Sequence, residues 1–337
     1  MKPLISIVIP IYNAASFITE CLDTVLKQTY NQYEVILVND ASTDQSVEVI
    51  THYLDIRPQV QNVRLLLNEK NMGPGGSRNR GIEAARGEYI YFADADDEML
   101  PECLELLERP MRHHTFDFVG GGVEVLFAGS AKIQRFLQQQ MAVYNASEID
   151  YDHLFESFYR MVVWNKLYRK AFLTENQLHF ENDIFHEDQL FLFRLAFCTH
   201  AYSVVPFVTY RYVKRESSIT GIYTEKNYSD LIRVIGGMKR IASEYASVPA
   251  KQRAARKHIF MLQCNVSMHV LDSLTIPRHQ QSHYVQQFGK IGLPLLEYLT
   301  IPKGYWRDRI AFPLFYLWPW LFIRIYRLIQ HISTTKA

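Results

Sequence analysis

Three carboxylates crowd the segment that follows the apolar run at residues 89–93: Asp94, Asp96 and Asp97 lie within four residues of one another. Like charges this close repel each other unless a cation lies between them. Carboxylate oxygens prefer Mg²⁺ or Mn²⁺, and a cation held by one or two carboxylates usually completes its shell with water and substrate phosphates. The segment therefore predicts a divalent-cation site that takes a nucleotide diphosphate, with a solvated acidic turn as the alternative.

A second pair of acids, Glu187 and Asp188, opens an apolar helical pattern at residues 190–197. Acids in a first turn commonly complement the helix dipole, which is one interpretation of the pair. The other is that Asp188 faces a cleft as a general base, because a carboxylate within hydrogen-bond reach of a hydroxyl can accept its proton as the oxygen attacks.

A glycine-rich stretch at residues 73–76 follows the third apolar run and includes Gly75. As a loop of small residues it could let the backbone approach a sugar or diphosphate, while Arg78, one turn into the next helix, offers a planar cation to phosphate oxygens. Neither a Walker loop nor a dinucleotide fingerprint fits, since the Lys-Ser/Thr pair is missing and the stretch does not follow the first strand. A flexible loop with a helix-face arginine is the alternative.

Two later segments carry further polar groups. Trp164 and Lys166 lie in the first. Arg211 and Ser218 lie in the second, at residues 210–220, which begins at the end of a strand-like run at residues 202–212. A mixture of Arg, Lys and Ser after a strand suits a mobile loop that closes over phosphates. An ordinary basic surface turn, and a solvated lysine at 166, remain the alternatives.

The elements that must position these residues alternate between short apolar runs and helical patterns. Runs at residues 5–9, 34–38, 63–67, 89–93 and 116–119, with helices between them, predict an α/β fold with a mostly parallel, helix-covered central sheet. Ligands of such sheets lie beyond the carboxyl ends of the strands, so the residues after each run matter most. These residues are Pro10, Tyr12 and Asn13 after the first run, Asp40 after the second, Asn71 after the third and Asp94 after the fourth.

The chain has 337 residues, and its 36 basic and 35 acidic side chains give a net charge of +1. That balance provides no global field for nucleic acid, so we expect no nucleic-acid partner. We expect three segments: residues 1–120 and 121–225, which form the two halves of the α/β domain, and residues 226–337, a helical carboxyl-terminal region.

Taken together, six motifs make the sequence similar to a known family. They occur in the family's order and lie at residues 6–13, 38–44, 71–79, 92–97, 164–168 and 186–188. The sequence resembles the family 2 glycosyltransferases of the GT-A fold, of the bacterial type that builds capsular, exopolysaccharide and other cell-envelope glycans. The first segment would then be the half that binds the nucleotide-sugar, and the second the half that binds the acceptor.

The resemblance implies inverting transfer of one hexose or N-acetylhexosamine from a nucleotide-sugar, usually a uridine one, with Mg²⁺ or Mn²⁺ and no covalent intermediate. By motif position, Pro10, Tyr12 and Asp40 would hold the nucleoside, and Arg78 the diphosphate or sugar. Asp94 would contact the ribose or the metal shell, Asp96 would bind the metal, and Asp188 would be the base. The same motifs add Asn13, Asn71 and Gly75 to the donor site and offer Trp164, Lys166 and Glu187 as acceptor or phosphate contacts. The polar segment at residues 210–220 offers Arg211 and Ser218 for the same contacts.

Single-sugar addition is expected over polymerisation, because no Gln-x-x-Arg-Trp sequence of the processive synthases follows Asp188. Two other functions remain open. A sugar nucleotidyltransferase would normally have a glycine-rich basic loop after the first strand, which residues 10–13 do not provide. A non-catalytic assembly subunit would bind a nucleotide-sugar but tolerate the loss of Asp188.

The carboxyl-terminal tail combines aromatic and basic side chains at residues 305–327. This mixture suits a segment lying in a membrane interface, and the longest apolar stretch, at 310–323, is too short to span a bilayer. The amino terminus shows no signal-peptide pattern. We therefore expect a cytoplasmic protein, peripheral at the inner face of the membrane, with a glycan or polyprenyl-diphosphate-linked acceptor. A tail packed on the catalytic core or on a second subunit, in a homo-oligomer, is the alternative.

Overall fold

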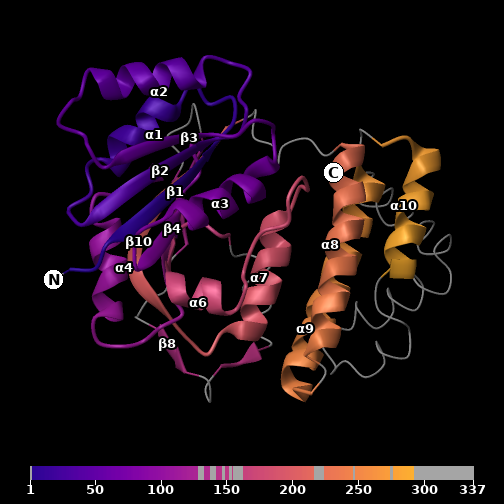
Figure 1. Cartoon of the computed structure of the whole chain (residues 1–337). Coiled ribbons are helices and arrows are strands. Elements are labelled where there is room, and N and C mark those ends of the chain that lie inside the picture. The colour runs from indigo at the N-terminus through magenta and orange to yellow at the C-terminus, as the bar shows by residue number, and fades with distance from the viewer. Residues whose placement is uncertain are drawn as a thin grey trace. The chain divides into compact units, whose positions relative to one another are not determined.

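The computed structural model describes residues 2–127, 133–136, 142–145, 149–151, 154, 162–215, 224–245, 247–273 and 276–291 (Figure 1). The chain divides into two compact units, Met1–Ile149 with Met161–Ser218, and Asp150–Arg160 with Ile219–Ala337. Strands from the expected segments 1–120 and 121–225 pair in one sheet of the first unit.

The amino-terminal half of that sheet is parallel, as the apolar runs predict. Its strands lie in the order β3-β2-β1-β4 and span Ile5–Ile11 (β1), Tyr33–Asn39 (β2), Val63–Leu67 (β3) and Tyr89–Phe92 (β4). The helices between them are Ile18–Val25 (α1), Ser46–Asp55 (α2) and Gly73–Ala84 (α3). Each parallel pair needs such a crossover, so the helices follow from the strand order.

Past β4 the sheet is mixed. Lys166–Arg169 (β9) runs antiparallel to β4 and to Phe118–Phe127 (β6), which pairs in parallel with Ala201–Lys214 (β10). The shorter strands Glu98–Met99 (β5), Ile133–Phe136 (β7) and Ala142–Asn145 (β8) pair antiparallel with β10, β6 and β10. The parallel prediction therefore holds for β1 to β4, whereas β9 is an antiparallel strand at a position where the apolar runs predict none.

Helices cover both faces of the central strands. Ile7 of β1 and Leu37 of β2 are fully buried in a core shared with α1, α2 and Cys103–Met111 (α4). The neighbouring residue Val8 packs instead against Gly81 of α3. Each buried aliphatic side chain stabilises the fold by roughly 1.5–3 kcal/mol, so the strands that carry the site are held from two sides.

The close approach of β6 to β10 gives the first prediction. A Cβ added at Gly121 would lie 2.0 Å from Oγ1 of Thr209, whereas one at Gly120 would lie 3.7 Å from Cγ of Lys166. We expect Gly121→Ala to lower the free energy of unfolding by about 1–3 kcal/mol, through overpacking, and Gly120→Ala to change it little. Urea unfolding followed by circular dichroism measures both variants, and equal midpoints would contradict the packing of β6 on β10.

The second unit contains the helices Glu225–Glu244 (α8), Pro249–Asp272 (α9) and Arg278–Ile291 (α10), which pack on one another. A capping box of Thr224 and Asn227 starts α8, with the N–H of Thr224 donating to Oδ1 of Asn227 at 2.9 Å. No helix within these described ranges is long and apolar enough to cross a membrane. The tail at 305–327, for which we predict membrane contact, lies outside the described residues.

Candidate active site

The polar segments after β1, β2 and β3 meet at one edge of the sheet, as the sequence predicts. Ile11, Asn39 and Leu67 lie side by side in register. Hydrogen bonds continue this alignment past the strands, from the N–H of Asp40 to the carbonyl of Ile11 and from the N–H of Asn68 to the carbonyl of Asn39, both at 2.8 Å. The predicted convergence therefore holds for the ends of β1, β2 and β3.

Asp40 is a buried carboxylate of this edge, with 2% of its surface exposed. Its Oδ1 accepts hydrogen bonds from Nδ2 of Asn68 at 2.7 Å and from the N–H of Met72 at 2.9 Å. Nδ2 of Asn68 also donates to Oγ of Ser77 on α3 at 3.1 Å. Asp40 is therefore fixed between β2 and α3 by internal hydrogen bonds, and its contact with a nucleoside remains a prediction.

Asn13 joins two loops of this edge to each other. At φ +49° it accepts hydrogen bonds from the N–H of Thr43 at 2.8 Å and of Asp44 at 3.3 Å, while its own N–H donates to Ser42. Asp44 in turn accepts from the N–H of Ser46 at the start of α2, at 3.0 Å. Residues 42–46 thus form a hydrogen-bonded turn before α2, which is the ordinary role of such residues.

The other predicted donor residues of this region differ in exposure. Tyr12 is 49% exposed, which leaves its ring open to a ligand. Pro10 is partly buried in β1, opposite Val38. The Oδ1 of Asn71 accepts the N–H of Gly73 at the start of α3, at 3.1 Å. Their contacts with a donor remain predictions.

The acidic turn after β4 is held in place by β10. The Tyr210 hydroxyl donates to Oδ2 of Asp97 and accepts from the N–H of Asp94, both at 3.0 Å, and the N–H of Val213 donates to Oδ1 of Asp97 at 2.9 Å. Asp97 is 2% exposed and so fixes the turn. The side chains of Asp94 and Asp96 remain 28% and 33% exposed, which leaves them as the carboxylates that a ligand could reach.

The electrostatics of the turn suit a cation. Burial, together with the charge of Asp94, raises the pKa of Asp96 to about 6, and the same causes raise the pKa of Asp97. No group of three or more His, Cys, Asp and Glu side chains among the described residues could hold a metal ion. The oxygen donors of Asp94 and Asp96 nevertheless fit Mg²⁺ or Mn²⁺, which take one or two carboxylates together with phosphate oxygens and water.

Arg78 joins the acidic turn to the second pair of acids. Its guanidinium lies 2.8 Å from Oδ1 of Asp94 and 2.6 Å from Oε1 of Glu187, and its side chain is 6% exposed. Burial raises the pKa of Glu187 while Arg78 opposes that rise, and the two carboxylates hold the pKa of Arg78 above its usual value. The arginine that we predict at the diphosphate is therefore a buried bridge between two carboxylates.

The glycine-rich stretch is not a loop, so that part of the prediction is wrong. Residues 73–76 form the first turn of α3, where a proline is well tolerated because its missing N–H has no helical partner. A Cβ at Gly75 would lie 2.6 Å from the carbonyl of Glu181 and 2.9 Å from Cγ of Glu187. The absence of a side chain at Gly75 thus allows the backbone of Glu181 to pack closely against α3. A contact of Gly75 with a donor remains a prediction.

Asn79, one turn further along α3, anchors the chain that leads to the second acid pair. Its side-chain amide donates to the carbonyl of Phe180 and accepts the N–H of the same residue, both at 2.8 Å. Residues 180–183 are thereby held against α3, which sets the start of Glu187–Cys198 (α7).

Glu187 and Asp188 have different surroundings although they are adjacent. Glu187 is buried and binds Arg78, whereas Asp188 is half-buried and accepts the N–H of Gln189 at 2.8 Å. The ammonium group of Lys166 carries a charge opposite to that of Asp188 and interacts with it electrostatically. Burial lowers the pKa of Lys166 to about 7, and Asp188 opposes that shift. Its ammonium group donates to the carbonyls of Val162 and Trp164, so it is a buried group rather than a solvated lysine.

The structure gives the other predicted contacts local partners. The Trp164 ring stacks on Tyr210, with ring centroids 4.5 Å apart. Arg211 forms ion pairs at 2.6 Å with Glu98 and with Glu124, which join β10 to β5 and β6. Ser218 lies outside the described residues.

Three residues to which the sequence analysis assigned no role are important in the structure. Tyr210 supports the acidic turn, as described above. Asn165, at φ +57°, accepts the Thr209 hydroxyl at 2.7 Å and donates to the carbonyl of Gly121 at 3.0 Å. Arg215 donates to the carbonyl of Asp96. The sequence carries a weak signal only for Asn165, since asparagine tolerates positive φ.

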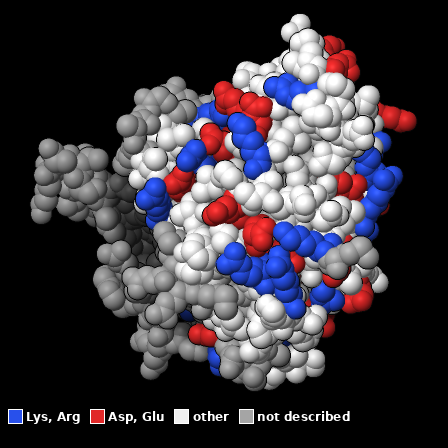
Figure 2. All heavy atoms as spheres, turned by 90° about the vertical axis from the view of Figure 1, so that its left-hand side faces the viewer, with Lys and Arg blue, Asp and Glu red and all other residues white. Residues whose placement is uncertain are grey.

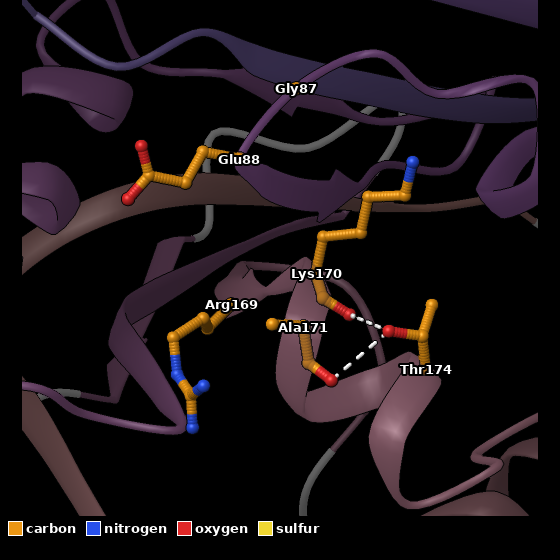
Figure 3. Close-up of a pocket in the computed structure, with 6 residues that line it drawn as sticks. All are labelled: Gly87, Glu88, Arg169, Lys170, Ala171 and Thr174. Atoms are coloured by element: carbon orange, nitrogen blue, oxygen red, sulfur yellow. Dashed lines mark hydrogen bonds between the residues drawn. The ribbon is translucent and has the colours of Figure 1, made fainter.

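A hollow of about 380 Å³ lies at the opposite end of β4 from the acidic turn (Figure 3). It is lined by Gly87, Glu88, Arg169, Lys170, Ala171 and Thr174. The Thr174 hydroxyl donates to the carbonyls of Lys170 and Ala171, at 3.2 and 3.1 Å. The hollow is separate from the candidate site, because it lies before the strand begins.

Acidic and basic side chains lie next to one another on the face shown in Figure 2, in keeping with the net charge of +1. Opposite charges that neighbour each other partly cancel at a distance. On this face the charged groups therefore act mainly on their close neighbours, as they do in the candidate site.

The mixed sheet with helices on both of its faces matches a solved structure of the GT-A fold. A crystal structure of S. aureus TarS 1-349 in complex with UDP-GlcNAc matches 100% of this chain and 92% of that one, with a TM-score of 0.75 and 22% identity. The family model of glycosyl transferase family 2 matches residues 6–175, and the chain belongs to this family.

Curated relatives match about two thirds of the chain. EpsH of Bacillus subtilis (strain 168) is 34% identical over 66% of this chain and 64% of EpsH. The succinoglycan biosynthesis protein ExoO of Rhizobium meliloti (strain 1021) is 29% identical over 65% of this chain and 63% of ExoO. The chain spans less than two thirds of the length of the first curated relatives that it matches.

Proposed function

We propose that this chain transfers one sugar, a hexose or N-acetylhexosamine, from a UDP-sugar to a hydroxyl of a glycan acceptor, with inversion at the anomeric carbon. The observation that carries the proposal is the Arg78 bridge. It connects Asp94, in the acidic turn, to Glu187, next to Asp188, through contacts of 2.8 and 2.6 Å. In this proposal the buried Arg78 guanidinium would fix the distance between the donor at the acidic turn and the base Asp188.

The roles that we propose for individual residues are those that the family resemblance implies. Asp40 and Tyr12 would hold the nucleoside at the ends of β2 and β1. Asp188 would accept the proton of the acceptor hydroxyl as its oxygen attacks, a single displacement that inverts the configuration. Mg²⁺ or Mn²⁺, held by Asp96 with Asp94 in its shell, would offset the charge of the departing diphosphate.

For the acceptor we propose a lipid-linked or cell-envelope glycan at the inner face of the cytoplasmic membrane. The named role of ExoO in succinoglycan biosynthesis supports a polysaccharide acceptor. The aromatic and basic tail at residues 305–327 supports membrane contact, because such side chains favour the interface between lipid and water. A homo-oligomer built through the same tail remains the other proposal for that segment.

Calorimetry with UDP, GDP, their sugars and nucleoside triphosphates, first with Mn²⁺ or Mg²⁺ and then with a chelator, tests the donor half of the proposal. Binding of uridine compounds that requires the cation supports it, and the tightest sugar identifies the donor. Tighter binding of triphosphates would favour a sugar nucleotidyltransferase. Metal-dependent binding without transfer to any acceptor would favour an assembly subunit.

Asp96→Asn tests the cation site directly. We expect the Kd for UDP in the presence of Mn²⁺ to rise about tenfold to a hundredfold, because the amide removes a negative charge from the proposed metal shell. Asp55→Asn, an exposed change on α2, serves as the control and should leave that Kd unchanged. An equal Mn²⁺ dependence of UDP binding in Asp96→Asn and wild type would contradict the assignment.

A further inference from the structure

The two half-exposed carboxylates of the acidic turn each have an arginine partner, and the two pairs differ in tightness. Arg78 contacts Asp94 at 2.8 Å with 6% of the arginine side chain exposed. Arg215, just after β10, lies 3.9 Å from Oδ2 of Asp96 with 21% of its side chain exposed. The first pair is locked in the interior, whereas the second is longer and more accessible to solvent.

Arg215 is nevertheless directed at the turn by several contacts. Its guanidinium donates to the carbonyl of Asp96 and lies over the ring of Phe17, 5.0 Å from the centroid. A second carboxylate, that of Glu20 on α1, lies 3.7 Å away. These contacts hold a unit positive charge beside the carboxylate that we assign to the divalent cation.

The frame beneath Arg215 is rigid. Tyr210 and Val213 of β10 both hydrogen-bond to Asp97, so the end of this strand and the acidic turn keep a fixed spacing. Asp96 and Arg215 therefore cannot separate through movement of either backbone without breaking buried hydrogen bonds. Turning the Arg215 side chain away breaks its own contacts with Asp96, Glu20 and Phe17 but leaves this frame intact.

From this geometry we infer that Arg215 competes with the divalent cation for the carboxylate of Asp96, so that the cation binds as the guanidinium turns away. A guanidinium and a metal ion cannot both lie against the outer face of one carboxylate without strong repulsion between like charges. The arginine thus weakens the affinity of the free enzyme for the metal alone. The inference rests on the proposed cation site at Asp96.

The test is the affinity for Mn²⁺ without nucleotide, measured from the electron paramagnetic resonance of free Mn²⁺ during titration of the full chain. We expect Arg215→Met to bind Mn²⁺ about fivefold to tenfold more tightly than wild type. This is the factor that corresponds to losing the attraction between the unit charges of Arg215 and Asp96, about 4 Å apart in a solvent-like dielectric. Methionine keeps an apolar stem against Phe17. Arg215→Lys, which keeps the charge but loses the planar fork, should lie between the two.

Lys214→Met is the matched control, because it removes the same charge one residue away, where the ammonium lies over the Phe127 ring. It should leave the Mn²⁺ affinity unchanged. Equal tightening in the 214 and 215 variants would show a general effect of net charge and overturn the inference, as would an unchanged or weaker affinity in Arg215→Met.

Wild-type calorimetry with UDP and Mn²⁺ separates the two proposals. If UDP binding requires Mn²⁺ while Arg215→Met binds Mn²⁺ as wild type does, the competition is wrong and the proposed function stands. If UDP does not bind with Mn²⁺, the proposed function fails, whatever the Arg215 variants show.

Discussion

Asp188→Asn should lower the rate of sugar transfer by about 10²–10⁴-fold, the contribution typical of a general base, while UDP binding in the presence of Mn²⁺ stays within about twofold of wild type. The amide has nearly the same shape as the carboxylate but does not accept a proton. Asp188 is half-buried, and its oxygen accepts the N–H of Gln189, a bond that an amide oxygen also makes. The loss should therefore lie in the chemical step.

Radiolabelled transfer and calorimetry on the same protein samples measure the two quantities separately. Glu181→Gln, an exposed change seven positions earlier in the chain, is the matched control and should leave both the transfer rate and UDP binding unchanged. Full transfer activity in Asp188→Asn would reject the base assignment. A parallel loss of UDP binding would instead place Asp188 in the donor site.

Arg78→Met should lower the free energy of unfolding by about 3–5 kcal/mol and also abolish detectable transfer. The substitution leaves Glu187 buried without the cation that lies 2.6 Å from it, and breaking one side of a buried ion pair costs far more than losing a surface pair. It also releases Asp94 from its contact at 2.8 Å. Because burial already raises the pKa of Glu187, loss of the arginine should drive this carboxyl toward its protonated form.

Arg78→Lys separates stability from geometry. A lysine keeps the charge near both acids, but its single ammonium group does not reproduce the two-sided guanidinium fork. We expect it to recover part of the stability and little of the transfer rate. Arg57→Met, at the end of α2, removes a half-exposed arginine that lies 3.9 Å from Asp23, and should cost no more than about 1 kcal/mol. Urea unfolding and transfer rates measure all three variants, and equal losses in Arg78→Met and Arg57→Met would contradict the bridge.

The effect of Arg78 matters for function because the bridge spans parts of the chain with separate roles. Asp94 follows β4, and Glu187 opens α7. In the proposed reaction, their positions relative to each other would decide whether an acceptor hydroxyl near Asp188 meets a donor held at the acidic turn. A change at Arg78 should therefore alter both donor binding and the transfer rate. A change at Asp96 should mainly alter donor binding, and a change at Asp188 should mainly alter the transfer rate.

The sequence by itself determined the local elements and the edge at which they deliver polar groups. Apolar runs predicted β1 to β4 within about two residues, since a short apolar run bounded by polar residues is a local property of the sequence. The rule that parallel strands present ligands at their carboxyl ends then brought Asp40 and Asp94 to one edge. The motifs at residues 6–13, 38–44 and 92–97 indicated the family that the comparison confirms.

Only the tertiary structure decided which charges meet. Arg78 and Glu187 are 109 residues apart, and Tyr210 and Asp97 are 113 apart, so no spacing along the chain indicates either contact. The side chain of an arginine is chemically suited to phosphate and to carboxylate alike. The packing of α3 against residues 180–183 placed Arg78 between two carboxylates, and the antiparallel insertion of β9 brought Lys166 near Asp188. Which charged side chains contact each other depends on their burial and on the pairing of strands and helices that are distant in the sequence. The local pattern of residue types determines neither.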